Sequence, residues 1–417
     1  MKVSQLLKAI KGKSEGYEFC VKHRKRAADF SRTGKKLSFM LIVMYVIRLV
    51  KLSTVIEIMK FFREIGKDED TARRNSINEG RGKISETAFS EIFEMTAESG
   101  KEMESAEEYK GFRLYGFDGT TVKLENSDEL KEHFGKTTPT DGQVMARIHC
   151  VVDVLNGVIA DGDIGAYQTG EREMAMQAVE RLGEQRESLY MFDRGYWSPE
   201  LVDKVMESGG KFLMRMPSTA RAAVTKSADN SGYFKVEHDG RTHALRFFKF
   251  VLASGEVEIL ATNLTHEQMP DEFLPELYSK RWGIETKYSE LKTRLEIDRF
   301  SGKSVLFVKQ DFFATLVISN LVAMFAHEKS LELTRKNKDK PLKNPQKTNI
   351  ALGIGIFREY FVEIMFCPSD RQRNKLFDKL FKLLSLSVSC SRSDRVPRQR
   401  NDFAIRNKRS NRPKSVL

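Results

Sequence analysis

The chain has 417 residues, of which 40% are apolar and 31% are charged, and lysines and arginines outnumber acids by 70 to 58. This composition is typical of a globular protein with two or three domains, and it excludes collagen-like, low-complexity and disulfide-rich classes. The net charge of +12 favours a polyanionic partner such as nucleic acid, although a basic surface that meets only solvent has the same composition.

Cysteines and apolar runs indicate a cytoplasmic protein. The two most apolar runs, 37–47 and 312–325, are shorter than the roughly 20 residues needed to cross a bilayer, so we predict buried helices and no membrane partner. The first residues lack the apolar segment of a signal peptide. The cysteines show no C-x-x-C spacing, which argues against a zinc site or a secreted disulfide framework. They are Cys20, Cys150, Cys367 and Cys390.

Residues 1–108 are predicted to form a basic helical domain. Apolar residues recur with helical spacing at 37–50, 55–62 and 87–95, and an acidic helix is predicted around 98–108. Several short helices with basic residues are compatible with a helix-turn-helix that reads DNA ends. A plain packing domain fits the same pattern.

From residue 112 the pattern changes to the two-residue alternation of β-strands. One strand arrives at Asp118-Gly119, and a second alternating run covers 144–154. The second run meets Asn156-Gly157, a pair favoured in two-residue type I′ turns, before an apolar segment runs back. This is the clearest hairpin in the sequence.

The next elements alternate between helix and strand. A helix is predicted over 171–182, a buried strand over 189–192 that ends at Asp193, and another helix over 199–207. The order of strand, hairpin, helix, strand and helix predicts a mixed α/β layer fold. A β-rich insertion follows, with strands predicted at 212–216, 233–237, 244–252 and 257–262.

Two helices and a basic tail complete the chain. A long helix is predicted from 271 to 295 and another over 307–328. After Cys390 the chain holds nine basic residues against Asp394 and Asp402, so we predict a tail that contacts phosphates; a merely solubilising tail is the alternative.

The helix around residue 285 carries charged and aromatic side chains on one face. At 3.6 residues per turn, offsets of three, four and seven place four residues on that face. They are Tyr278, Arg281, Glu285 and Lys292. Solvent-facing helices often carry Glu and Lys at such spacing, so the charges alone do not define a site.

The neighbouring stripe of this helix is apolar and is predicted to pack on the core. Its residues are Leu277, Ile284, Tyr288, Leu291 and Leu295. Gly283 lies within the helix, where glycine costs about 1 kcal/mol relative to alanine, and this indicates a close approach by another segment.

The run YSKRWGIETKYSELK resembles the Y-R-E-K signature of bacterial insertion-sequence transposases of the DDE class. In that family the glutamate is the third catalytic acid. The first acid lies in a strand that ends Asp-Gly-Thr, and the second in a strand followed by glycine and an aromatic residue. Asp118-Gly119-Thr120 and Asp193-Arg194-Gly195-Tyr196 are similar to these two sites and stand in the right order. Taken singly, Asp118-Gly119 also fits a hairpin turn, and Asp193 also fits a helix cap.

The resemblance implies an α/β fold: a ribonuclease-H-like mixed sheet with a β-rich insertion, an N-terminal helical domain and C-terminal helices. The 92-residue interval from Asp193 to Glu285 is too long for one connection, which agrees with an insertion. The expected parts are a DNA-end-binding domain at 1–108, a catalytic core at 109–210 and 269–330, the insertion at 211–268, and a C-terminal region at 331–417.

The resemblance also implies a metal-dependent site. Displacement at a phosphodiester develops negative charge, and two divalent cations can meet it, held by hard carboxylate oxygens. Asp118, Asp193 and Glu285 are expected to be the catalytic metal ligands for two Mg²⁺ ions, with Mn²⁺ able to substitute. Arg281 and Lys292 are expected to hold phosphates of the DNA, and Tyr278 to donate its hydroxyl to another. Trp197 and Trp282 are expected in core packing, with base stacking as the alternative.

The resulting hypothesis is a cut-and-paste transposase of the bacterial cytoplasm and nucleoid. It would hydrolyse the DNA at inverted-repeat ends and join the freed 3′-hydroxyls to target DNA. Because two ends must be cut together, a homodimer that holds both ends is expected. No G-x-x-x-x-G-K-[ST] loop occurs, so no nucleotide cofactor is expected. The alternatives are a plain metal-dependent nuclease and a catalytically silent DNA-binding protein.

Overall fold

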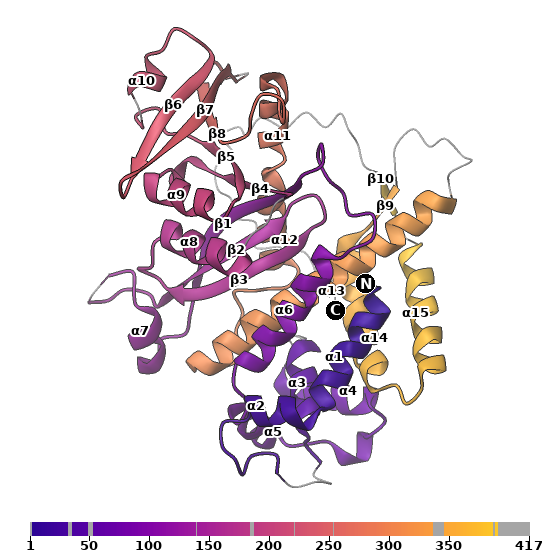
Figure 1. The fold of residues 1–417 in the computed structure, drawn as a ribbon. Coiled ribbons are helices and arrows are strands. Elements are labelled where there is room, and N and C mark those ends of the chain that lie inside the picture. The colour runs from indigo at the N-terminus through magenta and orange to yellow at the C-terminus, as the bar shows by residue number, and fades with distance from the viewer. Residues whose placement is uncertain are drawn as a thin grey trace.

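In a computed structural model, a mixed sheet of eight strands lies between two layers of helices (Figure 1). The structure describes residues 2–31, 36–48, 53–138, 140–183, 187–220, 222–252, 254–336, 346–386 and 388–390. The strands of the sheet are β1 (Arg113–Lys123), β2 (Met145–Asp153), β3 (Val158–Ala166), β4 (Ser188–Phe192), β5 (Lys211–Arg215), β6 (Ser231–His238), β7 (Arg241–Val251) and β8 (Val257–Thr262).

Helices precede, interrupt and follow these strands. The first six are α1 (Val3–Glu15), α2 (Tyr17–His23), α3 (Phe39–Arg48), α4 (Thr54–Glu64), α5 (Arg74–Gly82) and α6 (Thr87–Lys101). Those within the sheet region are α7 (Asp128–Phe134), α8 (Glu171–Leu182), α9 (Pro199–Glu207) and α10 (Ala222–Thr225). The last are α11 (Leu274–Ser279), α12 (Trp282–Thr293), α13 (Val305–Lys336), α14 (Ile350–Phe366) and α15 (Asp370–Leu384), with a small β9 (Gln346–Thr348) and β10 (Val388–Cys390) pair among them.

The strand order of the sheet is β3-β2-β1-β4-β5-β8-β7-β6. Strands β1, β2 and β3 are antiparallel, β4 and β5 run parallel to β1, and β8, β7 and β6 continue in antiparallel fashion. This mixed sheet with its helices confirms the predicted fold class. The strands predicted as an insertion extend the same sheet through the pairing of β5 with β8, so they form no separate layer. The boundaries of the domains stay a prediction.

The predicted hairpin is formed by β2 and β3, but the type I′ turn is wrong. Four residues, 154–157, connect the strands, and the amide of Gly157 donates to the carbonyl of Asp153 at 2.7 Å. Only Gly157 of the Asn-Gly pair has a positive φ, +69°. Asn156 is held by other bonds, because its side chain pairs with the backbone of Glu107 at 2.8 and 3.0 Å and with the Asp153 carboxylate.

Two apolar layers hold the sheet between the helices (Figure 1). On one face, α8 and α9 pack on aromatic and aliphatic strand residues such as Phe117, Tyr190 and Phe212. On the other face, α12 and α13 pack on residues such as Ile148 and Ile159, in a core that α1–α6, α14 and α15 continue. The N-terminal helices therefore share a core with the helices that follow the sheet.

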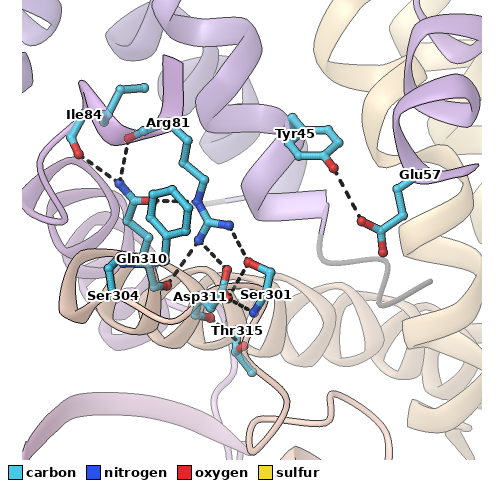
Figure 2. Close-up of polar contacts among 10 residues, drawn as sticks. Tyr45, Glu57, Arg81, Ile84, Ser301, Ser304, Gln310, Asp311 and Thr315 are labelled. Atoms are coloured by element: carbon cyan, nitrogen blue, oxygen red, sulfur yellow. Dashed lines mark hydrogen bonds and ion pairs between the residues drawn. The ribbon is translucent and has the colours of Figure 1, made fainter. Parts of the chain in front are cut away.

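A buried polar cluster joins α5 to the start of α13 (Figure 2). The Arg81 guanidinium is paired with the Asp311 carboxylate at 2.6 Å, and its Nε donates to the Gln310 side chain at 2.6 Å. Gln310 in turn donates to the Ile84 carbonyl at 2.8 Å, while Ser301 donates to Asp311 at 2.8 Å. Because the ionic groups are satisfied on several sides, the cluster fixes the two segments together.

Two helix predictions differ from the structure. The acidic helix over 98–108 is wrong, since α6 ends at Lys101 and left-handed residues at Ser105 and Lys110 turn the chain back toward β1. The long helix over 271–295 is wrong in its continuity: it begins as a 3-10 turn and breaks between α11 and α12. At this break, Lys280 and Arg281 donate to the carbonyls of residues three positions earlier, which tightens the turn.

The two apolar runs form buried helices, as predicted, in α3 and α13. α13 is long and apolar enough to cross a membrane, but 72% of its most apolar window is buried inside the protein, as in a core helix. The predicted basic tail, 391–417, lies outside the described residues.

Candidate active site

Asp118 and Asp193 lie just beyond the point where the parallel pairing of β1 and β4 ends. The register of β1 and β4 ends at the pair Gly116 and Met191, and each aspartate follows two residues later on its own strand. Asp118 lies within β1, so the hairpin-turn alternative is excluded. Asp193 follows β4 and caps the 3-10 turn Arg194–Tyr196, with its Oδ1 accepting from the Arg194 amide at 2.7 Å.

α12, which carries Glu285, crosses β1 close to Asp118. A Cβ on Gly283 would lie 2.7 Å from Cβ of Val154, so this glycine permits the close approach that the sequence predicted. Ile284 packs over Gly116 on β1. One turn further, the Tyr288 hydroxyl donates to the backbone carbonyl of Asp118 at 2.7 Å. These contacts fix the helix directly over the strand that carries Asp118.

Arg281 bonds to one of the three acids and lies within electrostatic reach of the other two. Its guanidinium, in a side chain that is only 9% exposed, donates to Oε1 of Glu285 at 2.9 Å. Burial lowers the pKa of Arg281, but Tyr278, Asp193, Glu285 and Asp118 together raise this pKa by more. Within the described part of the chain, no three Asp, Glu, His or Cys side chains lie close enough to hold a metal ion. The fold thus brings the three acids into one region, where Glu285 is paired with Arg281.

The environment of Asp118 makes its ionised form less favourable than it is in water. Burial raises the pKa of this carboxyl from 3.8 to about 6, and Glu171 and Glu285 add to the rise. The Gly119 amide, which donates to its Oδ1 at 2.9 Å, and the Arg281 charge oppose the rise only in part. The positive groups near Asp118 therefore do not fully compensate the burial of its ionised carboxylate.

The three residues predicted to bind DNA have different surroundings. The Tyr278 hydroxyl donates to Oδ1 of Asp193 at 3.3 Å, and Arg281 is buried beside Glu285. Lys292 is exposed, and its Nζ donates to the hydroxyl of Thr120, two residues past Asp118. All three lie along one side of α11 and α12, despite the break between these helices.

The tryptophans divide between core and surface. Trp197 is buried against Phe234, with ring centroids 6.1 Å apart, as predicted. Trp282, next to Arg281, is 60% exposed, so the core prediction is wrong for it: it is the first residue of α12, and it points away from the apolar stripe.

Several neighbours of the acids escape sequence reasoning. Tyr288 has the spacing of the apolar stripe, and nothing in the sequence distinguishes its hydroxyl from that of a packed tyrosine. Glu171 lies over Gly119, because a Cβ on that glycine would meet Cγ of Glu171 at 3.0 Å. Arg172 donates through Nε to the Gly195 carbonyl at 2.8 Å. These contacts depend on strand pairing, which no local pattern encodes.

Comparisons with known proteins agree on one family. A family model described as "Transposase DDE domain" matches residues 111–321, half of the chain, and this range contains all three acids. The chain is 21% identical over 266 residues to the transposase InsG for insertion sequence element IS4 of Escherichia coli (strain K12). That match spans 60% of this chain and 60% of the relative.

Among solved structures, the chain is similar to the piggyBac transposase in a synaptic complex with hairpin DNA, determined by cryo-electron microscopy. The TM-score is 0.47 at 10% identity, over 95% of this chain and 88% of that one. The domain match is what assigns the chain: it belongs to the DDE transposase family.

Proposed function

We propose that the protein is a cut-and-paste transposase that cleaves the ends of an insertion sequence and joins the 3′-hydroxyls to target DNA. One observation carries the proposal: within the matched DDE domain, Asp118, Asp193 and Glu285 come from three distant segments, and all three act electrostatically on the buried Arg281. A carboxylate with a pKa raised to about 6 at this place is what a site prepared for a cation would contain.

Although the three acids form no metal cluster in the described structure, where Glu285 is paired with Arg281, we propose that Asp118, Asp193 and Glu285 come together on divalent metal ions, which DDE transposases generally use. Their carboxylate oxygens are the hard ligands that Mg²⁺ prefers, and Mn²⁺ accepts the same donors. When bound, two such ions would supply a lowered pKa to the attacking hydroxyl and stabilise the negative charge on the leaving oxygen. The uncompensated Asp118 carboxyl fits this cation on chemical grounds.

The protein's own cationic groups would position the DNA. Lys292 is exposed beside Thr120, so its ammonium would bind a phosphate next to the scissile one. Arg281 would neutralise the acids and turn part of its bidentate fork toward a phosphate. Tyr278 orients the Asp193 carboxylate through its hydroxyl and would donate to a phosphate oxygen when DNA is present.

The partners proposed are the inverted-repeat ends and the target DNA. The charge of +12 supports a polyanionic partner. The E. coli relative is named for an insertion sequence element, which supports the same class of substrate. Since two ends are cut together, we propose a homodimer in the complex with both ends. We expect the protein to act in the bacterial cytoplasm at the nucleoid.

The test is a strand-cleavage assay with labelled terminal-repeat DNA and Mg²⁺. The parent protein is expected to yield nicked ends and, with a target plasmid, joined products; Asp193→Ala and Glu285→Gln are expected to bind the same DNA and to yield neither. Asp298→Asn, a change at an exposed acid, is the control and should cleave like the parent.

Two outcomes would support the alternatives. Cut ends without joined products would support a plain metal-dependent nuclease. Sequence-specific binding without cutting by the parent would support a DNA-binding protein that does not turn over.

A further inference from the structure

We propose that the first turn of α8 is a positioning element of the active site, in which Glu171 and Arg172 fix the backbone beside Asp118 on β1 and beside Asp193 after β4. The inference rests on the proposed function. α8 packs on the face of the sheet opposite α12, so the acids would be held from both sides (Figure 1).

Glu171 packs on the middle of β1, beside Asp118. Its side chain lies over Gly119, where an added Cβ would meet Cγ at 3.0 Å, Cδ at 3.2 Å and Oε1 at 3.3 Å. Arg147 on β2 binds the Glu171 carboxylate at 2.6 Å and keeps it in this place. The residue after Asp118 is therefore in close contact with Glu171, and this acid is anchored to the neighbouring strand.

Arg172 holds the end of β4. Its Nε donates to the Gly195 carbonyl at 2.8 Å, within the 3-10 turn that Asp193 caps. The pairing of β1 with β4 ends at Gly116 and Met191, before either acid. Beyond that point the register of β1 with β4 does not continue, so a link through α8 can set the spacing between Asp118 and Asp193.

The two contacts come from consecutive residues of one helix. Because both contacts belong to one rigid helical turn, the position of Gly119 and that of Gly195 are coupled through α8. A single surface ion pair would not couple them. Because misplacement of a reacting group by about 1 Å can reduce a rate by about 100-fold, this spacing matters to the chemistry. Neither residue needs to touch the substrate, so both are positioning residues.

The matched variants at position 172 separate the hydrogen bond from the charge. Glutamine places its side-chain amide nitrogen at the same distance along the chain as Nε of arginine, so Arg172→Gln keeps a donor for Gly195 without the positive charge. Arg172→Met has a similar stem and no donor. At position 171, Glu171→Ala removes the contact with Gly119, and Glu173→Ala is the control from the same turn, at an exposed acid.

Two readouts are measured for each variant: the single-turnover cleavage rate at saturating Mg²⁺ and the affinity of the DNA-free protein for Mn²⁺ by calorimetry. We expect Arg172→Met and Glu171→Ala to cleave at least about 10-fold more slowly and to bind Mn²⁺ about 5-fold more weakly. Arg172→Gln and Glu173→Ala should stay within about 2-fold of the parent in both readouts. DNA affinity in Ca²⁺ and the melting temperature should be close to those of the parent in all four.

Equal losses in Arg172→Gln and Arg172→Met would overturn the inference, because the charge and not the bond would then matter. Parental rates and Mn²⁺ affinity in Arg172→Met and Glu171→Ala would also overturn it. If the parent binds Mn²⁺ but does not cleave DNA, the proposed function fails, and the Mn²⁺ affinities still decide whether α8 positions the acids.

Discussion

Asp118 is the residue at which function conflicts most clearly with stability. Burial raises the pKa of its carboxyl to about 6 in the folded protein, against 3.8 for an exposed aspartate. The folded state therefore binds a proton more tightly than the unfolded state, and the free energy of unfolding decreases as the pH rises from about 4 to above 6. A buried carboxylate that is not fully compensated lowers the stability of the metal-free protein, whereas a cation site requires such a carboxylate.

Replacement of this carboxylate is expected to stabilise the metal-free protein. Asp118→Asn removes the charge but keeps the shape, so we predict a free energy of unfolding higher by about 1–2 kcal/mol at pH 7.5. The gain should shrink as the pH falls from 6 and vanish below about 4. Thermal unfolding in EDTA at several pH values measures it, with the exposed Asp298→Asn as control. Equal stability of parent and Asp118→Asn at pH 7.5 would contradict the burial of an uncompensated charge.

Sequence reasoning could identify residues with a motif but not their partners. Asp118, Asp193 and Glu285 stand in recognisable runs, and the Arg281–Glu285 pair follows from helical spacing of four residues. The bond of Tyr288 to the Asp118 carbonyl joins residues 170 positions apart and has no local signal. Which acids act on Arg281 is likewise decided by the fold.

At the scale of elements, the close packing of α12 against Val154, the residue after β2, depends on one glycine. Alanine is the better helix former by about 1 kcal/mol, so Gly283→Ala would stabilise an isolated helix. In the protein the new methyl would lie 2.7 Å from Cβ and 2.9 Å from the carbonyl oxygen of Val154, and backbone cannot move aside cheaply. The glycine is therefore retained for close approach.

We predict that Gly283→Ala lowers the free energy of unfolding by about 1–3 kcal/mol, as overpacking does in tight interiors. Gly12→Ala is the control: Gly12 lies in α1, nothing is within 4 Å of its added Cβ, and the change should stabilise by up to about 1 kcal/mol. Chemical denaturation of the two variants compares them. A stabilising Gly283→Ala would mean that α12 does not pack on Val154 as described.

The elements were predictable where the pattern was strong and local. The strands of β2 and β3 alternate clearly, and their hairpin was predicted. The turn was not, because Asn156 binds Glu107 and Asp153 instead of adopting a left-handed conformation. The break between α11 and α12 was also missed, since the sequence at the break contains no proline and no local pattern indicates the tightened hydrogen bonds.

At the scale of the whole molecule, the Arg81 cluster makes the N-terminal helices part of the catalytic body (Figure 2). Arg81 and Asp311 are each at most 5% exposed in their side chains, so the loss of one leaves a buried charge without its partner. The strands of the predicted insertion could be recognised in the sequence. Their addition to the main sheet could not be predicted, because it depends on the long-range pairing of β5 with β8.

Arg81→Met is predicted to lower the free energy of unfolding by about 3–5 kcal/mol, because it leaves the buried Asp311 carboxylate without its cationic partner. Hydrogen exchange should accelerate in α5 and in the first turns of α13 before it does in the sheet. Arg74→Met, at an exposed position of the same helix, should change neither. Protection in α13 that is unaffected by Arg81→Met would show that the cluster does not join the two segments.

The basic tail is expected to add to DNA affinity without adding specificity. Residues 391–417 carry nine lysines and arginines against two aspartates. If four of them bind phosphates, removal of the tail should reduce the slope of log affinity against log salt by about 3.6, since each contact contributes about 0.9. Fluorescence anisotropy on terminal-repeat and unrelated duplexes measures the slope. An unchanged slope would leave the tail a solubilising segment.

The account depends on Asp118, Asp193 and Glu285 acting on a metal, and metal rescue tests this most directly. A thiolate at a ligand position binds Mn²⁺ better than Mg²⁺, because Mn²⁺ accepts softer donors. We predict that Asp193→Cys loses strand cleavage in Mg²⁺ and recovers it in Mn²⁺. The ratio of the cleavage rate in Mn²⁺ to that in Mg²⁺ should be at least about 10-fold higher for the variant than for the parent. Equal cleavage in the two metals by Asp193→Cys, at any level of activity, would contradict a metal-binding role for this acid.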